Sequence, residues 1–350
     1  MKKLFIALLI LAAAVSVFAG GGGEKKTKGF FVATLDSSDN PWRTQMRNSI
    51  QAVVDEYKAK GIVANYAVFS AQNDATVQSQ QLDQLINQGV NLVVINPCSP
   101  TALNPIIDKA VAKGVIIMGV DQTINHPKAY NLTNDQRKWA QLHAEFVIKN
   151  MGGKGKLVRF DGIAGAPANE ERAEIWDKLL AANPGIEVVK HVNHDWDNAK
   201  AKQLMAAMLP ALPRIDGILN MECGPGIYQA LMEAGRPMPK AMVMDEGVEG
   251  VRILYEHNKK YPNNKLVAQI VENPPGVGAS GMIVGLQILM GKKIKEGVMK
   301  QPYNVFLYNP TLIIDERNVE EWYKKLEGRP DSEVLDNYLT TEQALKLYFE

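Results

Sequence analysis

The segment Gln84–Pro97, with the sequence QLINQGVNLVVINP, contains the pattern that decides the fold. Its centre, Leu92–Ile95, is apolar at every position instead of alternating between apolar and polar residues. A strand that is apolar on both faces is typical of a parallel sheet that helices cover on both sides. Asn96 follows the strand directly, and ligands of open parallel sheets bind beyond the carboxyl ends of the strands. The segment therefore predicts both an architecture and the edge at which a site is expected.

Strand-like runs of the same kind recur on both sides of this segment. They form two successive rounds, one before and one after residue 150, with helical patterns between the runs. One helix has a clear start, because Asn40 stands at the N-cap position and Pro41 at the first helical position. The two rounds predict an α/β protein with two doubly wound, Rossmann-like parallel-sheet lobes. The further runs are Phe30–Ala33, Ala64–Phe69, Val115–Val120, Leu157–Phe160, Ile186–Val189, Ile218–Met221, Met242–Met244 and Leu266–Ile270.

The first 28 residues predict the compartment. Lys2 and Lys3 precede an apolar run, Leu4–Val15, and small side chains lead up to a cleavage site after Ala19. This pattern predicts a signal peptide over residues 1–19 and a periplasmic mature protein. A membrane anchor is the alternative, but the run is shorter than the roughly 20 residues that a span needs. Residues 20–28 are polar and Gly-rich, and we interpret them as a flexible tether.

Charge and cysteine content exclude several functions. The chain has 39 Lys and Arg residues against 38 Asp and Glu residues, for a net charge of +1. Nucleic acids and anionic membranes attract strongly basic proteins, so neither is an expected partner. Cys98 and Cys223 are the only cysteines, and we expect both to be free thiols.

Polar and aromatic side chains follow the ends of the predicted strands. Asp121 and Asp245 each come directly after an apolar run, and Trp42 and Trp196 stand among polar residues in strand-to-helix loops. Arg172 follows the loop that contains Gly162 and Gly165. Carboxylates and guanidinium groups bind hydroxyl groups in pairs, and aromatic faces stack on the C–H faces of sugar rings. This set predicts a site for a hydroxyl-rich ligand.

Each candidate also has a structural interpretation. A tryptophan is more often part of a core than of a site, and we assign that role to Trp139, Trp176 and Trp322, which lie in helical patterns. Asp121 and Asp245 have the alternative of capping a helix or a turn. Arg172 follows two glutamates, so its alternative is a solvated cluster of surface charges.

The order and spacing of several segments resemble those of the ribose-type periplasmic binding proteins of ABC importers. The resemblance extends from about residue 29 to about residue 310. It implies the type I periplasmic binding protein fold, in which a three-strand hinge joins two lobes. The segments that carry it are Asn40-Pro41-Trp42, Gln84–Pro97, Ala110–Asp121, Gly162–Gly165 with Arg172, and Met244-Asp245.

The resemblance also implies ligand-binding positions. Three of them depart from the pattern of a ribose binder: Gln122 replaces an arginine, Glu272 replaces a glutamine, and Arg43 replaces an aromatic residue. Glu272 is open to two interpretations, a ligand contact or an ion pair at the hinge. The changes at Gln122 and Glu272 favour a neutral ligand other than ribose. The candidate ligand-binding residues are Asn40, Trp42, Arg43, Asp121, Gln122, Arg172, Trp196, Asn220, Asp245 and Glu272.

The same resemblance implies where the chain crosses between the lobes. The crossings are expected near Tyr130–Thr133, Glu272–Pro274 and Phe306–Pro310. Lobe 1 would then contain residues 29–131 with 273–306, and lobe 2 residues 132–272 with 307–350. The tail over 315–350 looks helical in part, and its role stays open.

Other motifs carry weaker signals. Gly276–Gly281 has the spacing of a dinucleotide fingerprint, but it opens no first strand–helix unit, and we interpret it as close helix packing. His191 and His194 would point to opposite faces of a strand, which disfavours a metal site. No nucleophile motif is present, so we expect no enzyme activity, no metal and no cofactor.

These observations predict the substrate-binding protein of an ABC importer. It would bind a neutral monosaccharide or polyol in the cleft, close around a hinge and deliver the ligand to the permease. We expect a monomer with no nucleic-acid partner. One alternative is a sensor that presents its closed form to a membrane chemoreceptor. A weaker alternative is a secreted glycosidase that uses Asp121 and Asp245 as acid and base.

Overall fold

The computed structural model describes residues 29–308 and 312–350, and the structural statements below concern these residues. The predicted signal peptide, residues 1–19, and the predicted tether, residues 20–28, lie outside the described residues. Within the described ranges, none of the helices combines the length and the hydropathy that a membrane span requires.

A seven-stranded sheet forms the first lobe, with the strand order β11-β12-β5-β4-β3-β1-β2. Neighbouring strands are parallel, except for the antiparallel pair at the β11 edge. The apolar run Leu92–Ile95 forms β3 between β1 and β4, and all four of its residues are buried. The other strands are β1 (Phe30–Asp36), β2 (Val63–Ser70), β4 (Ile116–Val120), β5 (Tyr130–Thr133), β11 (Met299–Lys300) and β12 (Val305–Leu307).

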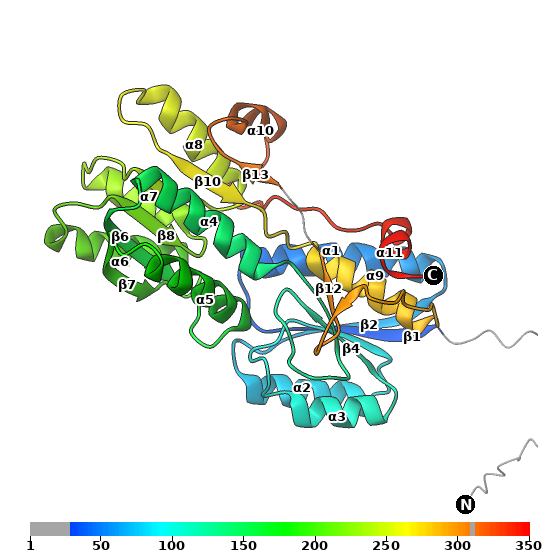
Figure 1. Cartoon of the computed structure of the whole chain (residues 1–350). Helices are drawn as coiled ribbons and strands as arrows, with labels where there is room; N and C mark the ends of the chain where they lie inside the picture. The colour runs from blue at the N-terminus through cyan, green and yellow to red at the C-terminus, as the bar shows by residue number, and fades with distance from the viewer. Residues whose placement is uncertain (1–28, 309–311) are drawn as a thin grey trace, which may run out of the picture.

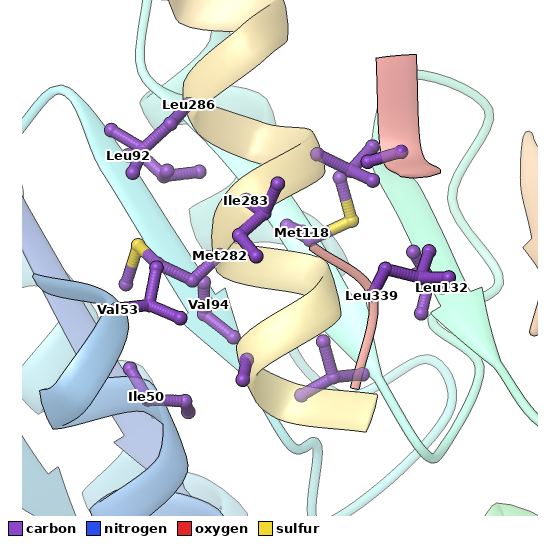
Figure 2. Close-up of a cluster of buried hydrophobic side chains, with 14 of the residues drawn as sticks. Ile50, Val53, Leu92, Val94, Met118, Leu132, Met282, Ile283, Leu286 and Leu339 are labelled. Atoms are coloured by element: carbon purple, nitrogen blue, oxygen red, sulfur yellow. The ribbon is translucent and has the colours of Figure 1, made fainter. Parts of the chain in front are cut away.

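Helices cover both faces of this sheet (Figure 1). One face carries α1 (Pro41–Ala59), α9 (Val277–Leu289) and α11 (Thr341–Tyr348), and the other carries α2 (Ala75–Asn87) and α3 (Asn104–Ala112). Figure 2 shows how side chains of α9 interdigitate with those of α1 and the strands. Coverage of both faces explains why these strands are apolar throughout.

The glycines of α9 allow this close packing. A Cβ atom on Gly281 would lie 2.3 Å from Cγ1 of Val120, and one on Gly278 would lie 2.5 Å from Cγ of Met46. Neither contact leaves room for a side chain. The glycine-rich spacing therefore serves helix packing, as the sequence predicts.

A six-stranded sheet forms the second lobe, with the order β13-β10-β9-β8-β6-β7. Neighbouring strands are parallel, except for β13, which runs antiparallel to β10. The strands are β6 (Gly155–Asp161), β7 (Ile186–Asn193), β8 (Gly217–Asn220), β9 (Ala241–Val243), β10 (Ala268–Val271) and β13 (Ile313–Ile314).

Helices also cover both faces of the second sheet. The helices α4 (Gln136–Met151) and α5 (Pro167–Ala181) pack on one face. The other face carries α6 (Asn198–Met208), the short helix η1 (Leu209–Ala211), α7 (Gly224–Glu233), α8 (Val248–Lys260) and α10 (Val319–Lys325). The predicted fold of two doubly wound lobes is confirmed.

The residues predicted to pack do so. Trp139 and Trp176 are 3% and 0% exposed, and Trp322 packs against the core of the second lobe. The indole N–H of Trp176 donates to the carbonyl of Ala140 across the α4–α5 contact. Cys98 and Cys223 are free thiols.

The crossings between the lobes differ slightly from the expected boundaries. Leu132 and Thr133 pair with β4 and β12 and so belong to the first sheet, whereas the sequence places them in lobe 2. The strand continues because ladder partners are present on both of its sides. The second crossing joins β10 to α9, and the third lies between β12 and β13, with residues 309–311 outside the described ranges.

The tail requires a larger correction. The sequence places residues 307–350 in lobe 2, but α11 packs on α9 of the first lobe (Figure 1). Ala344 and Tyr348 of α11 join the core that contains α1 and α9. An amphipathic stripe reveals which face of a helix is buried but not which lobe buries it, and this explains the error.

Between α10 and α11 the chain runs from the second lobe to the first as an extended segment, residues 331–340, which we call the C-terminal strap. On the second lobe, the amide of Leu335 donates to the carbonyl of Glu246 at 2.8 Å. On the first lobe, Gln45 of α1 bonds both the N–H and the C=O of Val334, at 3.0 and 2.8 Å. Asp336 accepts from Oγ of Ser49 on α1 at 2.8 Å. The strap is thus a fourth connection between the lobes.

Candidate functional site

The candidate site lies where the carboxyl ends of both sheets face each other. The β1–α1 loop supplies Asn40, which caps α1 by accepting from the amide of Arg43 at 2.8 Å, as its N-cap position predicts. Asp121 follows β4, and Asp245 follows β9. Loops at these ends gather because the strands of each sheet are parallel.

Six of the predicted ligand-binding residues line one small cavity between the lobes, of about 30 Å³, which we call the inner cavity. Of its nine lining residues, four come from the first lobe and its β1–α1 loop, four come from the second lobe, and one lies in a crossing. Its lining residues are Asn40, Trp42, Arg43, Asp121, Ala168, Arg172, Trp196, Glu222 and Asn273. A cavity of this size has space for a water-sized group but not for a sugar ring.

Buried ion pairs hold the first-lobe side of the inner cavity. Nη1 of Arg43 lies 3.0 Å from Oδ2 of Asp121, and the guanidinium group stacks 4.6 Å from the ring centre of Trp42. Asn96 donates to the same oxygen of Asp121 at 3.1 Å. Arg43, which stands where the family pattern has an aromatic residue, therefore positions the carboxylate.

Arg172 holds the second-lobe side. Its side chain is 1% exposed, so its alternative interpretation as a surface charge is wrong. Its Nη1 donates to Oε1 of Glu222 at 2.9 Å, and its Nε donates to Oε1 of Gln136 at 2.8 Å. The guanidinium carbon lies 3.9 Å from the ring centre of Trp139, in the range of a cation–π contact.

Amide side chains connect the two halves next to the hinge. Gln136 donates to Oδ1 of Asp121 and to Oδ1 of Asn273, in each case at 3.3 Å. Asn134 donates to the same oxygen of Asn273 at 2.6 Å, and the indole N–H of Trp42 donates to the Asn273 carbonyl at 2.8 Å. Asn134 and Asn273 both lie in crossings, so the site and the hinge share one hydrogen-bond network.

The loop after β7 presents Trp196. Asp195 and Trp196 both have left-handed backbone, with φ of 57° and 58°. The amide of Trp196 donates to Nδ1 of His194, and burial lowers the pKa of His194 to about 4, so this histidine is neutral at physiological pH. A Cβ on Gly162 would lie 2.4 Å from Cε2 of Trp196, so the indole needs glycine beside it.

The two histidines of β7 and its loop have different surroundings. Nε2 of His191 lies 2.8 Å from Oδ2 of Asp161, whereas the side chain of His194 is fully buried. Within the described ranges, no group of three or more His, Cys, Asp or Glu side chains is arranged to hold a metal ion.

A larger cavity of about 400 Å³, which we call the outer cavity, adjoins the inner one. The two share Asn40, Trp42, Trp196 and Glu222. Asp245 lines the outer cavity, accepts from the amide of Gly224 at 2.6 Å, and has its pKa raised to about 7 by burial. The remaining lining residues are Pro41, Asn198, Cys223, Pro225, Glu246, Gly247, Glu249, Gly250 and residues 331–334 of the strap.

Three predicted residues line neither cavity. Gln122 donates to Oδ1 of Asn96 at 3.3 Å, because the left-handed backbone of Asp121 turns the chain away from the cleft. Asn220 donates to the carbonyl of Glu222 at 2.5 Å. Glu272 faces the strap instead of the cleft.

The environment of Glu272 matches neither of its two interpretations. Its Oε1 accepts from Nδ2 of Asn337 at 2.5 Å, and the described residues give it no ion-pair partner. Burial raises the pKa of Glu272 to about 7. The residue therefore fastens the strap to the hinge.

Several residues of the cleft and of its hydrogen-bond network are not among the candidate ligand-binding residues, although some lie next to them in the sequence. Glu222 follows Asn220 by two positions and has a φ of 73°, and Asn273 follows Glu272 directly. Gln136 starts α4 after the first crossing and shows no motif. The strap gave no signal at all, because its residues have neither helical nor strand periodicity.

The described geometry can be compared with known proteins. The family model for the periplasmic binding protein domain matches residues 31–293. The ribose import binding protein RbsB of Bacillus subtilis is 27% identical over 281 residues, which are 79% of this chain and 86% of that protein. A xylitol-binding protein of Mycolicibacterium smegmatis is 30% identical over 190 residues, 52% of this chain and 54% of that protein.

Solved structures agree with the fold. An ABC transporter solute binding protein from Thermobispora bispora matches with a TM-score of 0.79 and 27% identity, over 90% of this chain and 94% of that one. The fructose-binding periplasmic domain of a hybrid two-component system matches with a TM-score of 0.69 and 21% identity, over 85% and 94%. The predicted resemblance to ribose-type binding proteins is confirmed.

Proposed function

The chain belongs to the periplasmic binding protein family, and we propose that it is the substrate-binding protein of an ABC importer. The ligand would be a monosaccharide or polyol held in the cleft between the lobes. One observation carries this proposal: Trp42 and Trp196, from different lobes, line both cavities, and paired carboxylate and guanidinium groups line the inner one.

The chemistry of the cleft suits hydroxyl groups. The Arg43–Asp121 and Arg172–Glu222 pairs place charged donors and acceptors side by side, so that one hydroxyl can accept from the first and donate to the second. The indole faces supply apolar surface for the C–H face of a ring. The outer cavity, at about 400 Å³, has the volume of an ordinary small-molecule site.

We propose that the lobes open and close around the crossings near Asn134 and Asn273. A ligand that touches both lobes shifts the population toward the closed form, which the permease then recognises. A micromolar affinity corresponds to about −8 kcal/mol, and the cost of closure is included in that value.

The expectation that the ligand is neutral is no longer supported. Gln122 and Glu272 suggested it, and neither residue lines a cavity. The ligand charge has to be argued from the residues that do line the cleft, as below.

Membership of the family supports a proposal for the location and the partners. We propose a periplasmic monomer that has the permease as its partner and lacks enzyme activity. A chemoreceptor stays an alternative partner. The glycosidase alternative is weakened because Asp121 is paired with Arg43 and lines a different cavity from Asp245. Release of nitrophenol from nitrophenyl glycosides would support the enzyme.

The test is calorimetry against a panel of monosaccharides and polyols, after a thermal-shift screen for binders. We expect Trp196→Ala and Arg172→Ala to weaken binding by about 2–4 kcal/mol, through lost stacking and unpaired hydroxyl groups. Arg214→Ala is the matched control, because Arg214 lies in the same lobe with its side chain 64% exposed. Unchanged affinity in both site variants would overturn the proposal. Arg172→Lys keeps the charge if Arg172→Ala fails to fold.

A further inference from the structure

The two cavities differ in charge. The inner cavity is balanced, with the guanidinium groups of Arg43 and Arg172 against the carboxylates of Asp121 and Glu222. The outer cavity has no Lys, Arg or His among its lining residues. Its lining contains the carboxylates of Glu222, Asp245, Glu246, Glu249, Asp331 and Glu333.

Half of these carboxylates have a cationic partner behind the cavity wall. Glu222 pairs with Arg172, Asp331 with Nη1 of Arg252 at 2.6 Å, and Glu333 with Arg329. The three others, Asp245, Glu246 and Glu249, form no ion pair with any described residue.

Glu246 is the most informative of these three. It is 3% exposed, yet it lines the cavity and has no Lys, Arg or His partner among the described residues. The amino terminus of α8 lies next in the chain, but its first amide, that of Val248, donates to the carbonyl of Glu333 at 2.9 Å. The carboxyl group of Glu246 has a hydrogen bond from its own backbone and a longer-range interaction with Arg172. A buried carboxylate without an ion-pair partner still costs free energy, which a bound cation offsets.

Two of these carboxyl groups, those of Asp245 and Glu246, have raised pKa values, and burial is the main cause. Burial raises the pKa of Asp245 to about 7, and burial and the nearby carboxylate of Glu222 raise the pKa of Glu246 well above its ordinary value. The part of both shifts that comes from Glu222 reflects repulsion between the carboxylates of this cavity, which a bound cation would reduce.

The geometry favours an organic cation over a metal ion. The described residues contain no group of three or more ligands that could hold a metal. Trp42 and Trp196 line the same cavity, and indole faces attract ammonium groups as well as stacking on ring C–H faces. A volume of about 400 Å³ accommodates a whole monosaccharide rather than a bare ion.

We propose that the outer cavity binds the ammonium group of an aminated sugar or polyol, with Glu246 and Glu249 as its principal partners. This inference rests on the proposed function and specifies its substrate class. The strap supplies one wall of the cavity through residues 331–334, so the tail takes part in selecting the ligand.

The test compares ligands that differ only in the amine. Suitable sets are glucosamine with glucose and N-acetylglucosamine, galactosamine with galactose, and 1-amino-1-deoxysorbitol with sorbitol. Calorimetry at pH 7 is expected to give at least about tenfold tighter binding for the amine in one set, the typical gain of a charge-assisted hydrogen bond. The acetylated sugar is expected to bind like the neutral one, because it has the nitrogen without the charge.

Substitutions of the lining carboxylates test whether the preference for the amine arises in the outer cavity. Glu246→Gln with Glu249→Gln is expected to reduce the preference for the amine over its neutral analogue to about threefold or less. Glu256→Gln is the matched control, because Glu256 lies on the same helix outside the outer cavity. The preference of the Glu256→Gln variant for the amine is expected to equal that of the parent protein.

The outcomes separate the two proposals. Equal or tighter binding of the neutral member in every set that binds would overturn the cation site and leave the proposed function intact. A preference for the amine that survives Glu246→Gln with Glu249→Gln would also overturn it. If no sugar or polyol of the wider panel binds, aminated or not, the proposed function itself is contradicted.

Discussion

The two halves of the cleft are built differently. On the first lobe, Arg43 lies between Asp36 and Asp121, and all three side chains are nearly inaccessible to solvent. On the second lobe, the loops after β7 and β8 carry Trp196 and Glu222 on left-handed backbone. The first half therefore relies more on fully buried charge pairs, although Asp121 also has left-handed backbone. The second half relies more on left-handed backbone, at Trp196, Glu222 and Cys223, because its own ion pair leaves the side chain of Glu222 19% exposed.

This difference has energetic consequences. Removing one partner of a buried ion pair leaves an uncompensated charge, whereas a left-handed non-glycine residue already has a cost, of order 1–2 kcal/mol, in the native state. The first half should be rigid and sensitive to charge changes, and the second should be sensitive to packing around its loops. The predictions below test this contrast.

The largest effect is expected in the first half. Arg43→Ala leaves Asp121 and Asp36 buried without their shared partner, which should lower the free energy of unfolding by about 3–5 kcal/mol. Urea denaturation followed by circular dichroism measures it. Arg317→Ala is the control, because the side chain of Arg317 is 78% exposed and its pair should contribute less than about 1 kcal/mol. Equal losses of unfolding free energy in the two variants would contradict the expected difference between buried and exposed ion pairs.

A smaller effect is expected in the second half. Gly162→Ala places a Cβ against the Trp196 ring, which should cost about 2–3 kcal/mol of stability by overpacking and weaken sugar binding. Gly165→Ala serves for comparison, because that position has a φ of 81° but nothing within 4 Å of the added Cβ. We expect it to cost about 1 kcal/mol and to leave binding unchanged. Similar ligand affinities in the two variants would mean that Trp196 does not need its present position.

The hinge should respond to pH through Glu272. Its carboxyl group ionises near its ordinary pKa in the unfolded chain and at about 7 in the folded chain, because burial disfavours the charge. Between these values the folded chain holds the extra proton, so the contribution of Glu272 to the free energy of unfolding falls as the pH rises toward 8. Glu272→Gln keeps an acceptor for Asn337 and should be about 2 kcal/mol more stable than the parent at pH 8, with no gain at pH 4. A gain that is independent of pH would contradict this explanation.

The smallest effect concerns the strap, which touches both halves. Gln45→Ala removes both hydrogen bonds to Val334 and should lower stability by about 1–2 kcal/mol. Gln51→Ala is a control on the same helix, because Gln51 bonds only the exposed Asp55. A larger opening of the lobes in the Gln45 variant, measured by small-angle scattering, would assign the strap to the hinge, and unchanged scattering would assign it to the cavity wall alone.

The fold could be predicted because its signals are local. The apolar run Leu92–Ile95, the cap at Asn40 and the small residues of α9 each specify their own backbone through burial, hydrogen bonding or close approach. The order of such signals along the chain then determined the two sheets. The lobe that buries α11 could not be predicted, since it depends on contacts with a helix about 60 residues earlier in the sequence.

The site could be predicted only in part, for a related reason. A place after a parallel strand locates a residue at the correct edge of the sheet, which was sufficient for Asp121 and Trp42. It does not fix the direction of the side chain, and the left-handed turn at Asp121 directs Gln122 away from the cleft. Glu222 takes the place expected for Asn220, because its own backbone turns it toward Arg172.

Two neighbouring amides of the strap can report the opening of the cleft. The N–H of Val334 is held by a side chain of one lobe, and that of Leu335 by a carbonyl of the other. When the lobes separate, at least one of these protons has to lose its acceptor and become exchangeable with solvent. The exchange rates of these two adjacent protons therefore report how often, and from which side, the cleft comes apart.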